Sequence, residues 1–253
     1  MSDNTYSRPD VVNFWNRTTV RVIGDLVGRP NAIELFRNWV RWGYILDAGC
    51  GTGYTTRILA DNPHYQKMVG VDRSPDMITR AAEFEKMNPK GIEYHVAELE
   101  NIPFEESLFE GILCTGVLMH NDESEIKKIF NEFYRVLGNG GLAVVSVTHP
   151  SLIFPGSPAR DDKSNWVKFI PLENKPYGIS QRMIEVYMDI DKNVIRTELW
   201  HHPISLYRES AENSGLELMQ IHEPIVKKEH LLIPEWGKAH GYPGYYQMLL
   251  LKR

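Results

Sequence analysis

The sequence has few cysteines and no long apolar run, and both shortages restrict the class of protein. Cys50 and Cys114 are the only cysteines among 253 residues. Each ends an apolar run, so we expect two buried thiols rather than a disulfide framework. No apolar stretch reaches the length of a membrane helix, and the polar beginning MSDNTYSRPD lacks the apolar segment of a signal peptide. We therefore expect a cytoplasmic protein that does not enter a membrane.

Basic charge is also scarce. The chain has 28 Lys and Arg against 33 Asp and Glu, a formal net charge of -5. Proteins that bind nucleic acids gain much of their affinity from clustered basic side chains that contact phosphates. The short pairs Lys127-Lys128 and Lys227-Lys228 are typical of a solvated helix face and a strand end. The composition therefore disfavours a nucleic-acid partner.

Strands alternate with helical segments through residues 44–149. Nearly continuous apolar runs such as MVGV and AVVSV predict strands covered on both faces. Their alternation with helices predicts right-handed crossovers and a doubly wound, mainly parallel α/β sheet. Two helices are expected earlier, between residues 11 and 40, with a break at GRPN.

The pattern of alternating strands and helices ends after residue 149. A proline-rich segment without periodicity is followed by RMIEVYMDI and NVIRTELWH, which predict a β-hairpin joined by DKN. The helix ISLYRESAENSG and the strands LELMQIHEP and YYQMLLLKR would then complete the sheet. We expect a single domain of four parts: N-terminal helices that cover the site (1–43), a cofactor-binding core (44–149), an inserted substrate lid containing the hairpin (150–203), and the completion of the sheet (204–253).

A glycine-rich turn, DAGCGTG, follows the first predicted strand. Gly49, Gly51 and Gly53 allow a sharp turn and a close approach to a ligand, because glycine has no Cβ. Ligands of doubly wound sheets bind at this place, outside the carboxyl ends of the strands. The spacing G-x-G-x-G nevertheless differs from the G-x-G-x-x-G of dinucleotide sites.

Acidic residues end the neighbouring strands. Asp72 follows the glycines at the distance expected for a carboxylate that binds ribose hydroxyls, and Glu98 follows the third strand. Together with Asp47, they place three acids on one sheet edge. Such an edge disfavours a phosphate-rich ligand and suits a nucleoside that carries positive charge.

The region from Ile45 to His149 resembles the class I S-adenosylmethionine-dependent methyltransferases, close to the small-molecule type called the methyltransferase 11 group. LDAGCGTGYTTR resembles the first motif of that family, VGVDRSPDMI the second and AELENIPFEESLFEGI the third, while FYRVLGNGGLAVVSV resembles the helix, turn and strand after the fourth. The resemblance implies a Rossmann-like fold and S-adenosyl-L-methionine as cofactor. It also implies methyl transfer to an O, N or C nucleophile of a small molecule, with a biosynthetic role.

The resemblance assigns the first part of a cofactor site. Gly49, Gly51 and Gly53 would pass close to the methionine part and the ribose, and Asp47 would orient their loop. Asp72 would hold the ribose hydroxyls. Gly53 could instead serve only helix packing.

The remaining implied cofactor contacts concern the adenine and the methionine. Arg73 and Met77 would flank the adenine, Glu98 would accept from its amino group, and the Leu99 backbone would contact its edge. Thr115 would line the methionine moiety, or simply end its strand. Glu98, like Glu110, stands where the family usually has Asp.

A sulfonium methyl group needs no metal or covalent intermediate, so positioning should supply most of the catalysis. A general base is required only where the nucleophile must lose a proton. We rank His149 before His202 and His120 as candidates, with a structural role open for each. The sequence has no H-E-x-x-H motif and no zinc-like spacing of Cys and His, so we expect no metal.

Aromatic residues are concentrated in the N-terminal helices and the inserted segment. We expect Tyr6, Trp15 and Trp200 to contact the substrate, since an aromatic-rich pocket suits a flat or hydrophobic small molecule. The rings could equally form the core of the lid itself.

Two other functions stay open at this point. An RNA or protein methyltransferase is disfavoured because no basic domain is present, and CTGVLMH stands where such enzymes have an N-P-P-Y-type motif. A protein that binds S-adenosylmethionine without catalysis, and acts through a partner, would show the same cofactor motifs.

Overall fold

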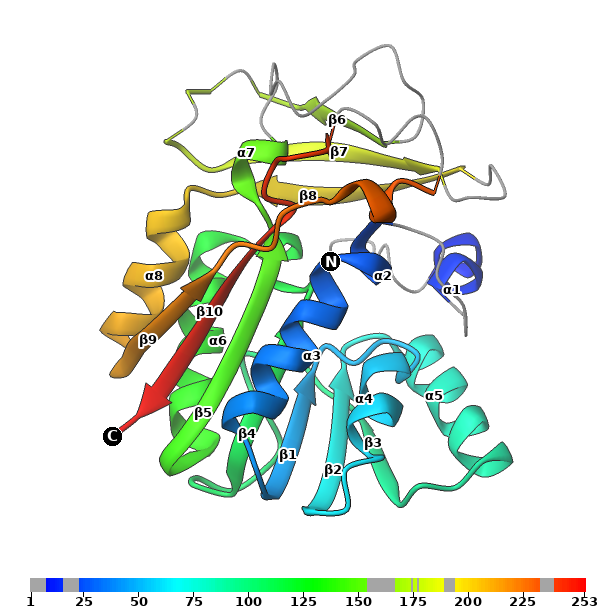
Figure 1. Cartoon of the computed structure of the whole chain (residues 1–253), viewed down its shortest axis with the longest axis vertical. Coiled ribbons are helices and arrows are strands. Elements are labelled where there is room, and N and C mark those ends of the chain that lie inside the picture. The colour runs from blue at the N-terminus through cyan, green and yellow to red at the C-terminus, as the bar shows by residue number, and fades with distance from the viewer. Residues whose placement is uncertain are drawn as a thin grey trace.

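A seven-stranded sheet of order β3-β2-β1-β4-β5-β10-β9 forms the centre of the computed structural model (Figure 1). The model describes residues 8–15, 23–153, 167–173, 175–176, 178–188, 194–232 and 239–253. The pairs among β1 to β5 are parallel, and β10 runs antiparallel to both of its neighbours. The strands are β1 (Gly43–Ala48), β2 (Tyr65–Asp72), β3 (Ile92–Val96), β4 (Phe109–Thr115), β5 (Leu137–Thr148), β9 (Leu216–His222) and β10 (Tyr245–Lys252). The predicted doubly wound, mainly parallel α/β fold is confirmed.

Alternate residues of each central strand are buried on opposite faces of the sheet. Ile45 and Leu113 pack with α3 (Gly28–Trp39) and α4 (Tyr54–Leu59) on one face. Leu46 and Ile112 pack with α6 (Glu123–Val136) and α8 (Ile204–Asn213) on the other. Such two-sided burial requires strands that are apolar at every position, which is why their runs are nearly continuous.

Helix boundaries follow local capping chemistry. The Asp122 carboxylate accepts hydrogen bonds from the Ser124 and Glu125 amides, and the Glu125 side chain accepts from the Asp122 amide, which makes a capping box at the start of α6. α5 (Pro75–Met87) begins with Ser74 as its N-cap. The expected break at GRPN is wrong, because α3 begins at Gly28 and a proline is tolerated in the first turn of a helix.

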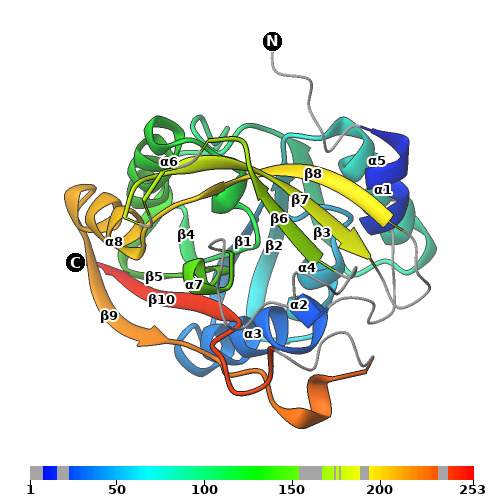
Figure 2. The same cartoon turned by 90° about the horizontal axis from the view of Figure 1, so that it is seen from above.

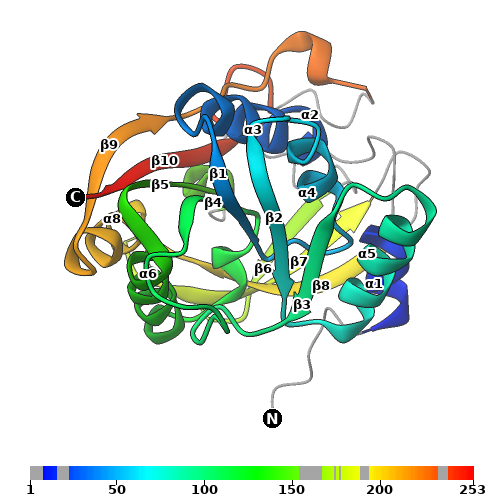
Figure 3. The same ribbon diagram turned by 90° about the horizontal axis from the view of Figure 1, so that it is seen from below.

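A second sheet lies over the carboxyl ends of the parallel strands (Figures 1 and 2). Seen from below, it lies behind the large sheet (Figure 3). Its order is β6-β7-β8, with all pairs antiparallel. β7 (Gln181–Met188) and β8 (Val194–His201) form the predicted hairpin, whose DKN connection lies outside the described residues. β6 (Val167–Pro171) was not expected, because five residues that end in proline give too short a pattern.

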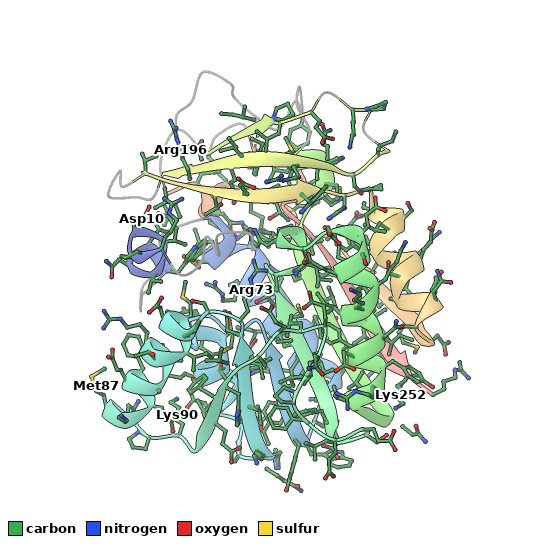
Figure 4. All side chains as sticks on the ribbon, turned by 180° about the vertical axis from the view of Figure 1, so that it is seen from behind. Asp10, Arg73, Met87, Lys90, Arg196 and Lys252 are labelled. Carbon is green, nitrogen blue, oxygen red and sulfur yellow. The ribbon has the colours of Figure 1, made fainter. Side chains whose placement is uncertain are left out.

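The N-terminal helix α1 (Pro9–Trp15) packs against the second sheet. Phe14 forms a small buried cluster with Ile195 of β8, and the Arg8 guanidinium donates to the Arg196 carbonyl over 3.2 Å. Asp10 and Arg196, labelled in Figure 4, mark this contact. Short helices α2 (Ile23–Leu26) and α7 (Pro150–Ile153), with the 3-10 turns η2 (Leu118–His120) and η3 (Lys228–His230), complete the described elements.

Cys50 and Cys114 are buried and unpaired, as expected. Among the helices that the structure describes, none has the length and apolar character required to cross a bilayer.

His202 joins the second sheet to the core. Its Nδ1 lies 2.8 Å from the Ser180 hydroxyl and its Nε2 lies 2.9 Å from the Asn121 carbonyl. A carbonyl only accepts, so Nε2 carries the proton and Nδ1 accepts. The ring stacks on Trp200 and meets the edge of Tyr207. Burial lowers the pKa of His202 to about 4.

The low pKa of His202 predicts a specific loss of stability in acid. Between pH 6.5 and 4 the unfolded chain binds a proton at this residue that the folded chain does not, so the stability falls as the pH falls through this window. At pH 5 the loss should be about 2 kcal/mol relative to pH 7. Urea unfolding of wild type and His202→Gln at both pH values measures it. The variant should be less stable at pH 7 but lose less on acidification, and an identical pH dependence of both proteins would contradict the assignment.

Candidate functional site

A cavity lies between the carboxyl edge of the large sheet and the underside of the second sheet. Its walls come from the ends of β1, β2, β4 and β5, from α2 and α3, and from β7 and β10. All the predicted cofactor residues except Gly53 line this cavity: Asp47, Gly49, Gly51, Asp72, Arg73, Met77, Glu98, Leu99 and Thr115. Arg73, labelled in Figure 4, lies between the two sheets.

The three glycines of the turn have different roles. Gly49 has a φ of +77°, and a Cβ there would lie 2.3 Å from a Val117 methyl group. Gly51 has a φ of +54°, and a Cβ there would meet no atom within 4 Å. Gly53 caps α4, and a Cβ would lie 2.3 Å from the Tyr94 hydroxyl, so its place is in helix packing rather than in the cavity wall.

Asp72 ties the glycine turn to the end of β2. One carboxylate oxygen accepts from the Gly51 amide and the other from the Ser74 amide, each over 2.9 Å. Each oxygen has capacity for a second donor, and the side chain lines the cavity. Burial raises the pKa of Asp72, and the two backbone donors oppose that rise.

Asp47 acts behind the turn. The Thr56 hydroxyl donates to its carboxylate over 2.6 Å, which fixes the first turn of α4 onto the end of β1. Burial raises the pKa of Asp47 to about 6, with the nearby Asp72 charge adding to the effect. Glu110, the other acid at an unusual position, lies away from the cavity and accepts from the Tyr44 amide over 2.6 Å.

The structure brings only one of the three candidate histidines to the cavity. His120 lines it, whereas His149 lies 2.9 Å from the Glu223 carboxylate and packs on Tyr246. Ser146 and Thr148 of β5 face the cavity, and the strand alternation turns His149 away from it. The ring nitrogens of His202 are occupied by the structural contacts described above.

The hydrogen bond of the His120 ring fixes its tautomer. Its Nδ1 lies 3.0 Å from the Glu198 carbonyl, so Nδ1 carries the proton and Nε2 is the acceptor nitrogen. Burial lowers the pKa of His120 to about 4, which leaves the ring neutral at pH 7.

Of the aromatic residues expected at the substrate, Trp15 lines the cavity. Trp200 does not, because it stacks on His202. Tyr6 lies outside the described residues.

Several cavity residues escaped the sequence analysis: Asp25, Arg29, Met119 and Glu185. Asp25 and Arg29 form an i,i+4 ion pair, and the guanidinium also stacks over Tyr54. The only available signal for Glu185 was its polar side chain at an inward position of RMIEVYMDI. No group of three metal-binding side chains occurs among the described residues.

Most of the charged side chains that line the cavity are acidic. Six carboxyl groups and two guanidinium groups belong to its described walls: Asp25, Asp47, Asp72, Glu98, Glu100 and Glu185, with Arg29 and Arg73. Such a lining favours a ligand with positive charge and repels phosphates.

Comparison with known proteins gives one family. Residues 45–141 match the model of a family described as methyltransferase domain. The chain is 30% identical over 140 residues to the biotin biosynthesis bifunctional protein BioHC of Teredinibacter turnerae, covering 51% of this chain and 24% of that protein. It is 29% identical over 154 residues to the tRNA U34 carboxymethyltransferase of Nautilia profundicola, covering 54% and 49%.

Solved structures share the fold over nearly the whole chain. An S-adenosylmethionine-dependent methyltransferase from Mesorhizobium loti superimposes with a TM-score of 0.66 at 17% identity, covering 88% of this chain and 96% of that chain. The chain spans only part of these two curated relatives, 24% and 49% of their lengths. The family model falls on the part of the chain that carries the glycine turn.

Gly49 and Gly51 have different surroundings, so alanine should mainly reduce stability at Gly49 and mainly weaken ligand binding at Gly51. Gly49→Ala adds a methyl group against Val117 at a positive φ, so it should mainly lower the thermal unfolding temperature. Gly51→Ala should cost only the backbone strain of about 1–2 kcal/mol. Its methyl group would enter the cavity, so it should weaken S-adenosylmethionine binding at least tenfold. Thermal unfolding and titration calorimetry measure both effects, and an unchanged affinity of Gly51→Ala would place the ligand elsewhere.

Proposed function

We propose that the protein is an S-adenosylmethionine-dependent methyltransferase that transfers a methyl group to an O, N or C nucleophile of a small molecule. The match of residues 45–141 to a methyltransferase domain supports this proposal. The observation that carries this proposal is the continuity of the cavity. It runs from the glycine turn and Asp72 to Glu185 on the underside of the second sheet, so cofactor and acceptor would share one cavity.

The residues present fit S-adenosylmethionine. Gly51 leaves open space where a side chain would stand, and Asp72 offers acceptor capacity at the end of β2 for the ribose hydroxyls. Met77, which is buried, and Arg73 would flank the adenine, with Glu98 and Leu99 at its edge and Thr115 near the methionine part. The acid-rich walls agree with a ligand that carries sulfonium and ammonium charges. When bound, the cofactor supplies an electrophilic methyl group.

The walls of the cavity would position the acceptor and exclude water. Trp15, Met119 and Tyr245 line its other side and would hold the acceptor in line with the methyl group. We assign residues 1–43 and 150–203 to the cover that excludes water, residues 44–149 to cofactor binding, and residues 204–253 to the completion of the sheet. Placement and exclusion of water account for most of the rate of such a transfer.

His120 is our candidate for the general base, in place of His149. Its Nε2 is the acceptor nitrogen of a neutral ring, and the residue lies in the cavity wall. It would take the proton of an acceptor that must lose one. Strand alternation turns His149 away from the cavity, and the contacts with Ser180 and Asn121 hold His202 in place. Both histidines would therefore have structural roles.

A small-molecule acceptor is supported by the charge of the cavity. The relatives include a biotin biosynthesis protein and a tRNA methyltransferase, so the family alone does not choose between them. Glu98 and Glu100 at the cavity, with Asp25 and Glu185 inside it, would repel a phosphate backbone.

Methyl transfer itself is tested by the formation of S-adenosylhomocysteine. The protein is incubated with S-adenosylmethionine and either a small-molecule extract or total tRNA, and the products are identified by mass spectrometry. We expect S-adenosylhomocysteine and a methylated small molecule. Methylation of tRNA alone would refute the acceptor class, and tight cofactor binding without transfer to either would refute catalysis.

Asp72→Ala should weaken S-adenosylmethionine binding at least tenfold, because two charge-assisted hydrogen bonds of about 1.5–3 kcal/mol each are lost before compensation. Asp76→Ala is the matched control, since Asp76 is an exposed carboxyl on the neighbouring α5 that does not line the cavity. Titration calorimetry compares the two variants. Equal affinities would remove Asp72 from the cofactor site.

His120→Ala should lower the single-turnover rate by about 10²- to 10⁴-fold at unchanged cofactor affinity, for an acceptor that must lose a proton. His149→Ala should lower stability and leave that rate nearly unchanged. Because the pKa of His120 is about 4, the acid limb of the wild-type rate should lie near pH 4 rather than near pH 6.5. A rate lost in His149→Ala and kept in His120→Ala would reverse the assignment.

A further inference from the structure

Three polar side chains lie in a row across three neighbouring strands of the large sheet. Gln247 of β10 stands opposite His222 of β9 on one side and opposite Ser146 of β5 on the other, and Figure 2 shows these strands side by side. Gln247 is 0% exposed and Ser146 is 1% exposed. The adjoining residues of β10, Tyr246 and Met248, are buried as well. Polar groups buried this deeply must pair with one another or with a ligand.

The partners of Gln247 fix the orientation of its amide group. The Gly28 carbonyl lies 2.8 Å from one end of that amide. A carbonyl only accepts, so this end is Nε2, and its second hydrogen is donated to the Ser146 hydroxyl oxygen over 3.1 Å. The other end is therefore Oε1, which lies 3.1 Å from Nδ1 of His222. Because an amide oxygen only accepts, Nδ1 of His222 carries a proton.

The three donors of this row follow one another in a single direction, from His222 through Gln247 to Ser146. Hydrogen bonds arranged in such a chain polarise one another, which strengthens the last donor. The Ser146 oxygen is occupied by the Gln247 amide, and its own hydrogen has no acceptor within the described part of the chain. A buried donor without an acceptor costs free energy. Ser146 lines the cavity, so a bound molecule can supply that acceptor.

Ser146 lies beyond the part of the cavity assigned to the cofactor. The proposed cofactor residues follow or end the strands β1, β2, β3 and β4, and β5 lies on the far side of β4 from the other three. Thr148, the next residue on the same face of β5, also lines the cavity, together with Tyr245 of the neighbouring β10. β5 therefore presents its hydroxyl groups to the space that the methyl acceptor would occupy.

We propose that Ser146 donates a hydrogen bond to a carbonyl oxygen of the methyl acceptor, and that it thereby selects a carbonyl compound as substrate. This inference rests on the proposed methyl transfer and specifies its substrate class. A carbonyl oxygen has lone pairs and no hydrogen, so it complements a hydroxyl group that can only donate. A protonated amine has no lone pair for this hydrogen, and a hydrocarbon would leave it unpaired. Trp15 and Met119, in the same cavity, would contact the rest of the molecule.

The test compares acetophenone with ethylbenzene, which has a similar shape but no oxygen. Their binding to the protein saturated with S-adenosylhomocysteine is measured by ligand-observed NMR. Ser146→Ala should weaken the binding of acetophenone about fivefold, as the loss of one neutral hydrogen bond implies, and should change that of ethylbenzene by less than about twofold. Ser124→Ala is the matched control, because it removes an exposed hydroxyl group of α6 outside the cavity and should affect neither probe.

Wild type alone gives a second measurement, which decides the matter even where Ser146→Ala does not fold. The carbonyl carbon of isotope-labelled acetophenone should resonate further downfield in the complex than in cyclohexane, because donation to the oxygen withdraws electrons from that carbon. A bound resonance at the cyclohexane position would overturn the inference, and so would a failure of acetophenone to bind. Equal losses for both probes in Ser146→Ala would overturn it as well.

Two further outcomes separate this inference from the proposals on which it rests. A Ser146→Ala variant that weakens S-adenosylmethionine binding as strongly as Asp72→Ala would refute the inference alone, because the hydroxyl group would then belong to the cofactor site. Absence of cofactor binding by wild type would instead refute the methyltransferase function itself.

Discussion

The site depends on one carboxylate that receives two backbone amides from different segments. Asp72 accepts from Gly51 in the turn after β1 and from Ser74 at the start of α5. These two bonds fix the positions of neighbouring loops at the edge of the sheet, and they orient a side chain that lines the cavity. Asp47 supports the same turn from behind through Thr56. The shape and charge of the cavity at the glycine turn are therefore set by hydrogen bonds among residues 47–74.

This locality explains which features could be predicted from the sequence. The strands β1 to β5 are apolar at successive positions because both of their faces are covered, and the glycine turn needs residues without Cβ. Both requirements can be recognised directly in the amino-acid sequence. β6 could not be predicted, since five residues that end in a proline show no clear period. The start of α3 was misplaced because a proline in a first turn has the same appearance as a helix break.

Side-chain direction was the other limit. His149 does follow the strand that borders the cavity, as expected from the sequence. The alternation of side chains along that strand nevertheless directs His149 toward Glu223 rather than into the cavity. His120 reaches the cavity from a 3-10 turn that no pattern indicated. Asp25 and Glu185 lie far apart in the chain and line the same cavity because α2 and the second sheet cover the same edge. The family match ends at residue 141, whereas Trp15, Glu185 and Tyr245 of the cavity wall lie outside it.

The position of β10 has a consequence for how the protein acquires its structure. This strand lies between β5 and β9, yet both of those strands precede it in the chain. About a hundred residues separate β5 from β10, so their pairing closes a long loop. While the chain is being synthesised, β5 presents an open apolar edge until β10 has emerged and inserted. The nascent protein is thus exposed to wrong strand pairing while the roughly one hundred residues between β5 and β10 are synthesised, and β10 must insert before a strand of a neighbouring chain does.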